Sequence, residues 1–263
     1  MIKKLYKIFV SEKKRIEVIM YLNKLKSFLY FGHTYYCSCC DHSFRKFLPK
    51  GNIKRSNAQC PYCGSLERTR LLHLFLINET QIFSQHLKVL HIAPEACISS
   101  LLKNIDIDYI DGDINPALAR NTIDITDIHF PDDIFDLIIC SHVLGHVPNE
   151  FQAIKELYRV LKPTGTAIFM TLINRSSYET LEDPLITTPN ERVLVYGEPD
   201  LCRLHGLDFS KRLSSQGFIV VCIDYREKLS SEVLKRNRLG DGTRELIFEC
   251  KKEHLTSFAG ADL

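Results

Sequence analysis

Four cysteines in the first quarter of the chain have the spacing of a metal site. Cys37 and Cys40 form one C-x2-C pair, Cys60 and Cys63 form a second, and nineteen residues separate the two pairs. Each pair makes a tight knuckle, and two knuckles complete the tetrahedral four-thiolate shell of a structural zinc site. Such a shell leaves no position for a substrate, so the predicted Zn²⁺ stabilises the fold. Cys39 competes with Cys40 as a ligand, and the sequence leaves this choice open.

Two histidines follow an apolar segment later in the chain. His142 and His146 come after residues 135–140, which have the near-continuous apolar character of a strand covered on both faces. An imidazole titrates near neutral pH and can take a proton from a hydroxyl or an amine. Both histidines are therefore candidate general bases, and the alternative for His146 is a structural role between the loop and the next helix.

The elements that must position these side chains alternate between strand and helix from about residue 86, which predicts a parallel sheet. The predicted strands are 87–92, 107–111, 121–125, 135–140, 166–172, 217–224 and 244–250. The predicted helices are 96–103, 115–119, 150–161 and 206–216. Residues 173–200 read as an irregular lid or binding loop. Position alone predicts acceptor contacts for side chains on or just after it, namely Tyr178, Tyr196, Arg203 and His205.

The N-terminal part is basic and predicts one or two amphipathic helices over residues 1–31. Residues 1–72 contain 15 Lys and Arg against 4 acids, a net charge of +11, whereas the whole chain has a net charge of +2. This charge predicts an anionic partner, and the alternative is a solvated surface. Peripheral membrane contact through residues 1–31 is one option, and packing on the protein's own domain is the other.

A further helix is predicted from Leu66 to Ile77, with Ser65 as its cap. Arg68 and Arg70 lie in its first turns, where the helix dipole disfavours cations. Either a bound anion or simple surface exposure accounts for them.

The order of motifs from residue 135 to residue 165 resembles the class I S-adenosylmethionine-dependent methyltransferases of type 11. The matching segments are Phe-Asp-Leu-Ile at 135–138, Val-Leu-Gly-His-Val-Pro at 143–148 and Glu-Leu-Tyr-Arg-Val-Leu-Lys-Pro-Thr-Gly at 156–165. The chain is also similar to a bacterial subgroup with an N-terminal zinc ribbon, Cys-Gly-Ser-x-Glu-Arg before a helix, and Val-Leu-His-Ile-Ala-Pro-Glu after the first strand. The resemblance implies a Rossmann-like α/β fold with a seven-stranded, mostly parallel sheet and helices on both faces.

The first strand end departs from the usual family pattern. The family has an acid and then glycines here, whereas this chain has His91, Ala93 and Glu95, and no glycine between Gly64 and Gly112. A backbone without glycine approaches a ligand less closely. The resemblance implies that Ala93 lies beside the cofactor and that Glu95 faces its ammonium group, and the alternative is a degenerate site.

The later strand ends match the family better. An acid at the second strand end accepts the ribose hydroxyls in dinucleotide-like sites, which favours Asp113 followed by Ile114, with Asp111 as the fallback. The resemblance places the adenine amino group at Asp124 and the adenine ring at the amide of Ile125. It also places Ser141 on the floor beside the sulfonium.

The sequence therefore predicts an S-adenosylmethionine-dependent methyltransferase of the cytoplasm that acts on a small-molecule or glycan acceptor. One alternative is an RNA methyltransferase that binds nucleic acid through the basic zinc module, which we do not favour because aromatic-glycine patterning is missing. The other is a non-catalytic binding protein with a degenerate cofactor loop. The predicted segments are a basic helical segment 1–34, the zinc-ribbon module and following helix 35–80, the methyltransferase domain 81–252 and a tail 253–263.

Overall fold

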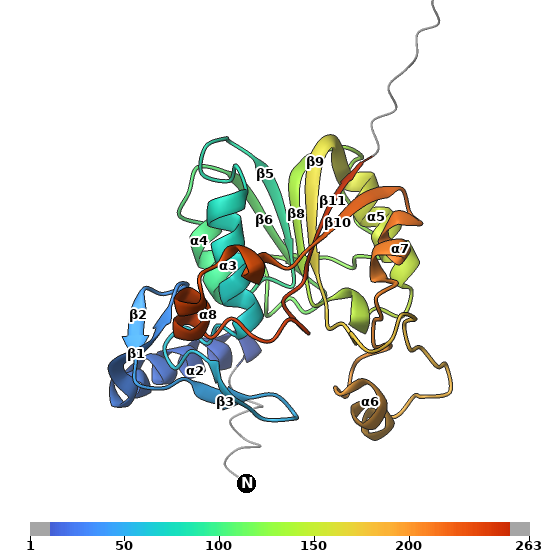
Figure 1. Ribbon diagram of the computed structural model, residues 1–263. Helices are drawn as coiled ribbons and strands as arrows, with labels where there is room; N and C mark the ends of the chain where they lie inside the picture. The colour runs from blue at the N-terminus through green and yellow to red at the C-terminus, as the bar shows by residue number, and fades with distance from the viewer. Residues whose placement is uncertain (1–10, 253–263) are drawn as a thin grey trace, which may run out of the picture.

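The computed structural model describes residues 11–252, and its centre is a seven-stranded sheet with helices on both faces (Figure 1). The strand order is β10-β11-β9-β8-β5-β6-β7. All neighbouring strands from β9 to β7 are parallel, and β11 is antiparallel to both of its neighbours. The predicted fold class is confirmed. The strands are β5 (Lys88–Ile92), β6 (Asp108–Asp113), β7 (Asn121–Thr122), β8 (Phe135–Ser141), β9 (Leu161–Met170), β10 (Phe218–Ile223) and β11 (Ile247–Lys252).

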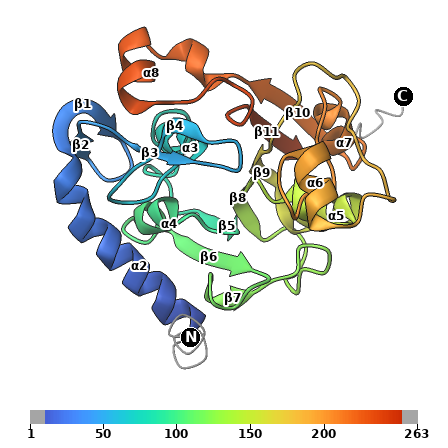
Figure 2. The same cartoon turned by 90° about the horizontal axis from the view of Figure 1, so that it is seen from below.

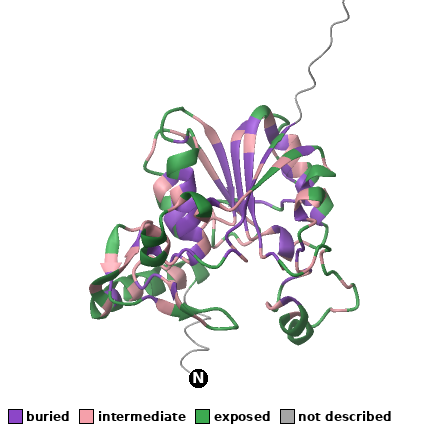
Figure 3. Ribbon diagram, viewed as in Figure 1, coloured by how far each residue is buried: buried purple, intermediate pink, exposed green. Residues whose placement is uncertain are grey.

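Alternate residues of the central strands build two separate cores, one on each face of the sheet. Leu137 and Ile139 of β8 join a core with α3 and α4, whereas Ile138 and Cys140 join a core with α5 and α7. Figure 3 shows these strands buried along most of their length. The helices are α2 (Glu12–Ser27), α3 (Glu67–Glu79), α4 (Ala96–Leu102), α5 (Glu150–Val160), α6 (Pro189–Tyr196), α7 (Phe209–Ser214) and α8 (Ser231–Asn237), with 3-10 turns η1 (Phe28–Tyr30), η2 (Leu144–His146) and η3 (Tyr225–Lys228).

The chain order of the strands reverses between β5 and β8. From β5 the chain proceeds outward to β6 and β7, and then returns to place β8 and β9 on the other side of β5. Ligands of doubly wound sheets bind beyond the carboxyl ends of the strands at such a switch point. The fold therefore directs attention to the residues that follow β5, β6, β7 and β8.

Two sequence-based element predictions differ from the structure, and one helix was missed. The predicted helix 115–119 is a turn, in which Asn115 Oδ1 accepts the N–H of Ala117 at 3.0 Å, a local contact that competes with helix formation. The predicted loop 173–200 contains α6, which begins with a capping box between Thr188 and Glu191. The helix α8, capped by Ser230, was not predicted.

The basic N-terminal segment forms a helix over Glu12–Ser27 but does not bury an apolar face. Of its residues only Ser27 is buried. Residues 1–10 of the predicted segment, and the predicted tail 253–263, lie outside the described residues. No helix within residues 11–252 combines the length and apolar character needed to cross a membrane. The exposed apolar side chains of this region are Val18, Ile19, Met20, Tyr21, Leu22, Leu25, Phe28, Leu29 and Phe31.

Two short antiparallel hairpins carry the cysteine pairs and lie beside α3 and α8 (Figure 2). They are β1 (Phe31–Cys37) with β2 (His42–Phe44), and β3 (Leu48–Lys50) with β4 (Arg55–Gln59). We call residues 31–65 the zinc module. Its small core contains Phe44 and Phe47 together with Cys37 and Cys60.

A fully buried arginine joins the zinc module to the sheet domain. The Arg70 guanidinium donates to four backbone carbonyls, those of Ala58, Ser65, Asn237 and Arg238, at 2.6 to 3.1 Å. The first two carbonyls belong to the zinc module and the other two to the end of α8. Carbonyl dipoles therefore compensate the charge of Arg70. Both explanations offered by the sequence, a bound anion and surface exposure, are wrong for this residue.

Candidate functional site

The four paired cysteines converge at one point of the zinc module. Their sulfur atoms all lie within 4.8 Å of one another. Cys37 Sγ is 3.6 Å from Cys63 Sγ, and Cys40 Sγ is 3.8 Å from Cys60 Sγ. Four sulfurs at about 2.3 Å from a tetrahedral ion lie about 3.8 Å apart, so the cluster fits Zn²⁺.

Cys40, and not Cys39, belongs to this cluster. The Cys39 thiol instead lies 3.8 Å from the carbonyl oxygen of Thr69. Ser65 does not cap α3 as predicted, since the cap residue is Leu66. The Ser65 hydroxyl lies 3.2 Å from both Cys37 Sγ and Cys63 Sγ, where it can donate to a thiolate.

The end of β5 forms a buried polar cluster. His91 is fully buried, and its Nε2 lies 3.0 Å from Glu95 Oε2 while its Nδ1 lies 3.1 Å from the Tyr109 hydroxyl. Burial alone raises the pKa of Glu95, but the hydrogen bond from His91 lowers it below its usual range. Ala93 has a φ of 49° and donates its N–H to the Gly112 carbonyl at 2.8 Å. The loop thus adopts the left-handed backbone of a glycine turn without a glycine.

The two acids at the end of β6 differ in what they contact. Asp111 is buried, pairs with Lys103 Nζ at 3.0 Å and accepts the N–H of Arg120 at 2.8 Å. Asp113 is half-buried and accepts one hydrogen bond, from the N–H of Asn115 at 2.7 Å. Asp113 therefore keeps lone pairs available at this strand end, and Ile114 beside it is 71% exposed.

The residues after β7 and β8 extend the same edge. Asp124 is exposed and accepts from the N–H and hydroxyl of Thr126, while Ile125 is buried. Ser141 ends β8, and its buried hydroxyl has no hydrogen-bond partner within residues 11–252. A buried hydroxyl without a partner is costly, so this atom is suited to a polar group of a ligand.

Both candidate bases line one cavity of about 50 Å³ beyond the end of β8. His142 Nε2 lies 3.0 Å from the Arg244 carbonyl, which only accepts, so this nitrogen carries the proton. Burial and the nearby Arg68 charge hold the pKa of His142 well below its usual range. His146 Nδ1 lies 3.4 Å from Asp200 Oδ2. The cavity is also lined by Arg68, Gly145, Thr171, Leu172, Glu198, Leu201 and Arg244.

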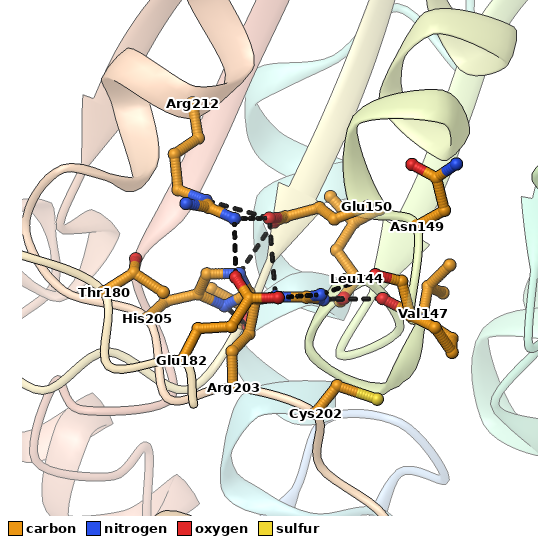
Figure 4. A network of polar contacts seen from close by, with 12 residues as sticks. Leu144, Val147, Asn149, Glu150, Thr180, Glu182, Cys202, Arg203, His205 and Arg212 are labelled. Atoms are coloured by element: carbon orange, nitrogen blue, oxygen red, sulfur yellow. Dashed lines mark hydrogen bonds and ion pairs between the residues drawn. The ribbon is translucent and has the colours of Figure 1, made fainter. Parts of the chain in front are cut away.

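A buried ionic network joins the start of α5 and the turn before it to the segment between β9 and β10 (Figure 4). Glu150 accepts from His205 Nε2 at 2.7 Å and from Arg212 Nε at 2.8 Å. Arg203 donates to the carbonyls of Leu144, Val147 and Pro148 and pairs with Glu182 at 2.7 Å. Arg203 and His205 are 1% exposed, and Tyr196 is also buried. None of these three side chains lines the cavity that contains His142 and His146, and Tyr178 is exposed, so the acceptor contacts of all four stay predictions.

Sequence reasoning missed several residues at the cavity. Glu198 and Asp200 follow α6, and their ligand atoms lie within 4.8 Å of the His146 ring nitrogen. Arg244 pairs with Glu198 at 3.1 Å. The acids on either side of Pro199 are a usable signal in a binding loop, but Arg244 lies about a hundred residues from His142, and nothing in the sequence connects them.

Comparison with known proteins agrees with this architecture in one segment. Residues 99–169 match the family described as "Methyltransferase domain". The chain is 35% identical over 74 residues to the tRNA U34 carboxymethyltransferase of Nautilia profundicola, which covers 28% of this chain and 25% of that protein. It is 31% identical over 78 residues to the sterol methyltransferase-like 3 of Botryococcus braunii, and this match covers 30% of this chain and 20% of that protein. The chain thus spans a quarter or less of the curated relatives it matches.

Solved structures match this chain at low identity and with TM-scores below 0.5. The YcgJ protein of Bacillus subtilis matches 70% of this chain and 98% of its own at 19% identity, with a TM-score of 0.45. An S-adenosylmethionine-dependent methyltransferase of Mesorhizobium loti matches 65% and 93% at 16% identity, with a TM-score of 0.48. The resemblance drawn from residues 135–165 is confirmed by the family match alone, since residues 99–169 match a methyltransferase domain.

Proposed function

We propose that this protein transfers a methyl group from S-adenosylmethionine to a hydroxyl or amine of an acceptor. The observation that carries the proposal is the convergence at one sheet edge of Asp113, the unpaired Ser141 hydroxyl and the cavity that holds His142 and His146. The edge lies at the switch point of the sheet, where ligands of this architecture bind.

The proposed cofactor contacts follow the strand ends. Asp113 accepts both ribose hydroxyls, Asp124 and the amide of Ile125 take the adenine, and Glu95 faces the ammonium group beside Ala93. The fit rests on two features of this structure, the free lone pairs of Asp113 and the orphaned Ser141 hydroxyl. When bound, the cofactor supplies an activated methyl on a sulfonium, so the protein chiefly aligns the acceptor and excludes water.

His146 is the better base of the two histidines. Its Nδ1 lies 3.4 Å from the Asp200 carboxylate, and neither ring nitrogen has a hydrogen-bond partner in the described part of the chain, so the ring is available to an acceptor. His142 has a depressed pKa and uses Nε2 to hold the Arg244 carbonyl, so it is a weak base and a positioning residue. In this proposal His146 would take the proton of the acceptor hydroxyl or amine. The bound cofactor would supply the methyl group, with its carbon–sulfur bond breaking and S-adenosylhomocysteine leaving.

The zinc module has a structural part in this proposal. The thiolates of Cys37, Cys40, Cys60 and Cys63 hold one Zn²⁺, which contributes directly to the folding of this small module. A closed four-thiolate site does not activate a substrate.

A small-molecule or glycan acceptor remains our preferred substrate, and RNA is the second candidate. The name of the Nautilia relative and the basic charge of residues 1–72 favour RNA, but the match spans only 74 residues, 25% of that relative. A non-catalytic binding protein is the third, because the first loop has no glycine.

The first test is calorimetry with S-adenosylhomocysteine. Asp113→Ala is expected to weaken binding at least about tenfold, because it leaves two ribose hydroxyls without their acceptor, at about 1 to 3 kcal/mol each. Asp106→Ala, a 96%-exposed acid remote from the strand ends, is the control and is expected to leave the dissociation constant unchanged. An unchanged constant in the Asp113 variant would discard the proposed ribose contact. No binding by the unsubstituted protein would favour the degenerate site.

A further inference from the structure

Three hollows share lining residues and lie next to one another between the outer surface and the strand ends, and we call this series the path. The outermost, of about 540 Å³, lies between the β3–β4 hairpin and α8. A second, of about 320 Å³, lies beside the turn of the same hairpin. The third is the small cavity that contains His142 and His146. Arg244 lines all three hollows and Arg68 lines the inner two.

The outer hollow carries cations without acidic partners. Lys54 and Lys235 are exposed and make no ion pair within residues 11–252. Arg238 donates to the Ser56 carbonyl at 3.3 Å and lies over the Tyr35 ring at 5.8 Å, again without a carboxylate. Unpaired cations from separate elements that converge on one hollow attract an anion.

The inner part of the path contains a further unsatisfied cation. Arg68 has an enclosed Nε that has no hydrogen-bond partner in the described part of the chain. Burial lowers the pKa of its guanidinium, and the charges of Glu95 and Glu198 offset this only in part. The nearest acid on the path, Glu198, is instead paired with Arg244.

Carboxylates interrupt this basic lining. Glu67 pairs with Arg55 at 3.0 Å, and Asp241 and Glu245 lie in the same wall. The backbone of a long nucleic acid needs a continuous basic surface. A concave hollow with interleaved acids favours a short, compact anion that contacts Lys54, Lys235 and Arg238 together.

We propose that this path is the acceptor site, and that the acceptor is a compact molecule with a phosphate ester or diphosphate remote from its methylated atom. This inference rests on the proposed function. Lys54, Lys235 and Arg238 bind the phosphate oxygens in the outer hollow, while the nucleophilic end of the acceptor lies at His146. Charge-assisted bonds to phosphate are the strongest available to such side chains.

Calorimetry with inorganic pyrophosphate tests the inference. Lys54→Gln with Lys235→Gln is expected to weaken pyrophosphate binding at least about tenfold, since hydrogen bonds to charged groups are the stronger class. Both side chains are exposed and unpaired, so the double variant is expected to fold normally. Lys155→Gln with Lys211→Gln removes the same charge from exposed positions on α5 and α7, and serves as the matched control.

The outcomes separate this inference from the proposed function because S-adenosylhomocysteine is titrated into the same samples. The affinity for S-adenosylhomocysteine is expected to be equal in the unsubstituted protein and in both double variants. The affinity for pyrophosphate is expected to fall only in the Lys54→Gln, Lys235→Gln variant. Cofactor binding without pyrophosphate binding, or equal losses in both double variants, would overturn the acceptor site and leave the proposed function intact. Pyrophosphate binding without cofactor binding would overturn both. If a structured RNA binds more tightly than pyrophosphate, and the Lys54→Gln, Lys235→Gln variant loses this binding, the ligand of the path is RNA and not a compact anion.

Discussion

The choice of Cys40 over Cys39 as a metal ligand depends on which thiol faces the knuckle. Cys40 Sγ points toward Cys60 Sγ at 3.8 Å, whereas Cys39 Sγ lies against the Thr69 carbonyl. Cys40→Ser is therefore expected to lose zinc and to destabilise the module, because ligand loss removes folding free energy. Cys39→Ser is the matched control and is expected to keep one zinc per chain. Metal analysis of both variants checks this, and zinc retained by the Cys40 variant would reassign the ligand.

In the proposed cofactor loop, Ala93 has the left-handed backbone of a glycine turn although it carries a side chain. Its φ of 49° costs a residue with a side chain roughly 1 to 2 kcal/mol. Ala93→Gly relieves this strain but gains entropy in the unfolded state, so the free energy of unfolding is expected to change by less than about 1 kcal/mol. Ala93→Val places a branched side chain in the same conformation and is expected to cost more than about 2 kcal/mol. Equal stability of the two variants in urea would contradict the backbone assignment.

Residue types and local spacing predicted the proposed zinc ligands and the acids at the strand ends. They did not predict the other residues that line the cavity. The two cysteine pairs make a local pattern, and Asp113 is the last residue of its strand. Arg68 and Arg244 meet His142 only because three distant elements end at one sheet edge. Arg70 looked like a misplaced surface cation because its four carbonyl partners belong to two other segments.

The segment between β9 and β10 is held by one buried carboxylate. Burial alone raises the pKa of Glu150, but the hydrogen bond from His205 and the charge of Arg212 lower it below its usual range. Glu150→Gln keeps the shape and removes the charge that Arg203, His205 and Arg212 share, so it is expected to cost about 3 kcal/mol of unfolding free energy. Glu179→Gln, an exposed position of the same segment, is expected to stay within about 0.5 kcal/mol. Urea denaturation compares them, and equal midpoints would show that the network contributes nothing.

Elements with a strong period were predictable, and short elements with local caps were not. Residues 135–141 and 150–160 have continuous or helical apolar patterns, and the structure forms both elements nearly at the predicted bounds. The helices α6 and α8 have eight and seven residues, too few to show a period, and they depend on caps and tertiary contacts. β9 begins at Leu161, earlier than predicted, because strand pairing with Phe135 starts directly after the helix.

The zinc module and the methyltransferase domain form one body through α8, and their union shapes the proposed acceptor path. The β3–β4 hairpin supplies one wall of the outer hollow, and α8 with the following loop supplies the other. Arg236 and Arg238 of this region lie over the Tyr36 and Tyr35 rings of the module. A displaced module would therefore open the hollow and separate Lys54 from Lys235.

Arg70 is the side chain on which this union depends. Arg70→Met fills similar volume but removes the donor of the Ala58, Asn237 and Arg238 carbonyls, while the Ser65 carbonyl keeps the N–H of Cys60. A lost partner costs about 1 to 3 kcal/mol, so a loss of at least about 3 kcal/mol is expected. Arg236→Met removes an exposed arginine that contacts the Tyr36 ring, and is expected to cost less than about 1 kcal/mol. Urea denaturation gives the stabilities, and the rate of zinc loss to a chelator reports on the module. Faster zinc loss in the Arg70 variant alone is expected, because a module released from α8 exposes its knuckles. Equal rates and equal stabilities in the two variants would show that other contacts hold the module in place.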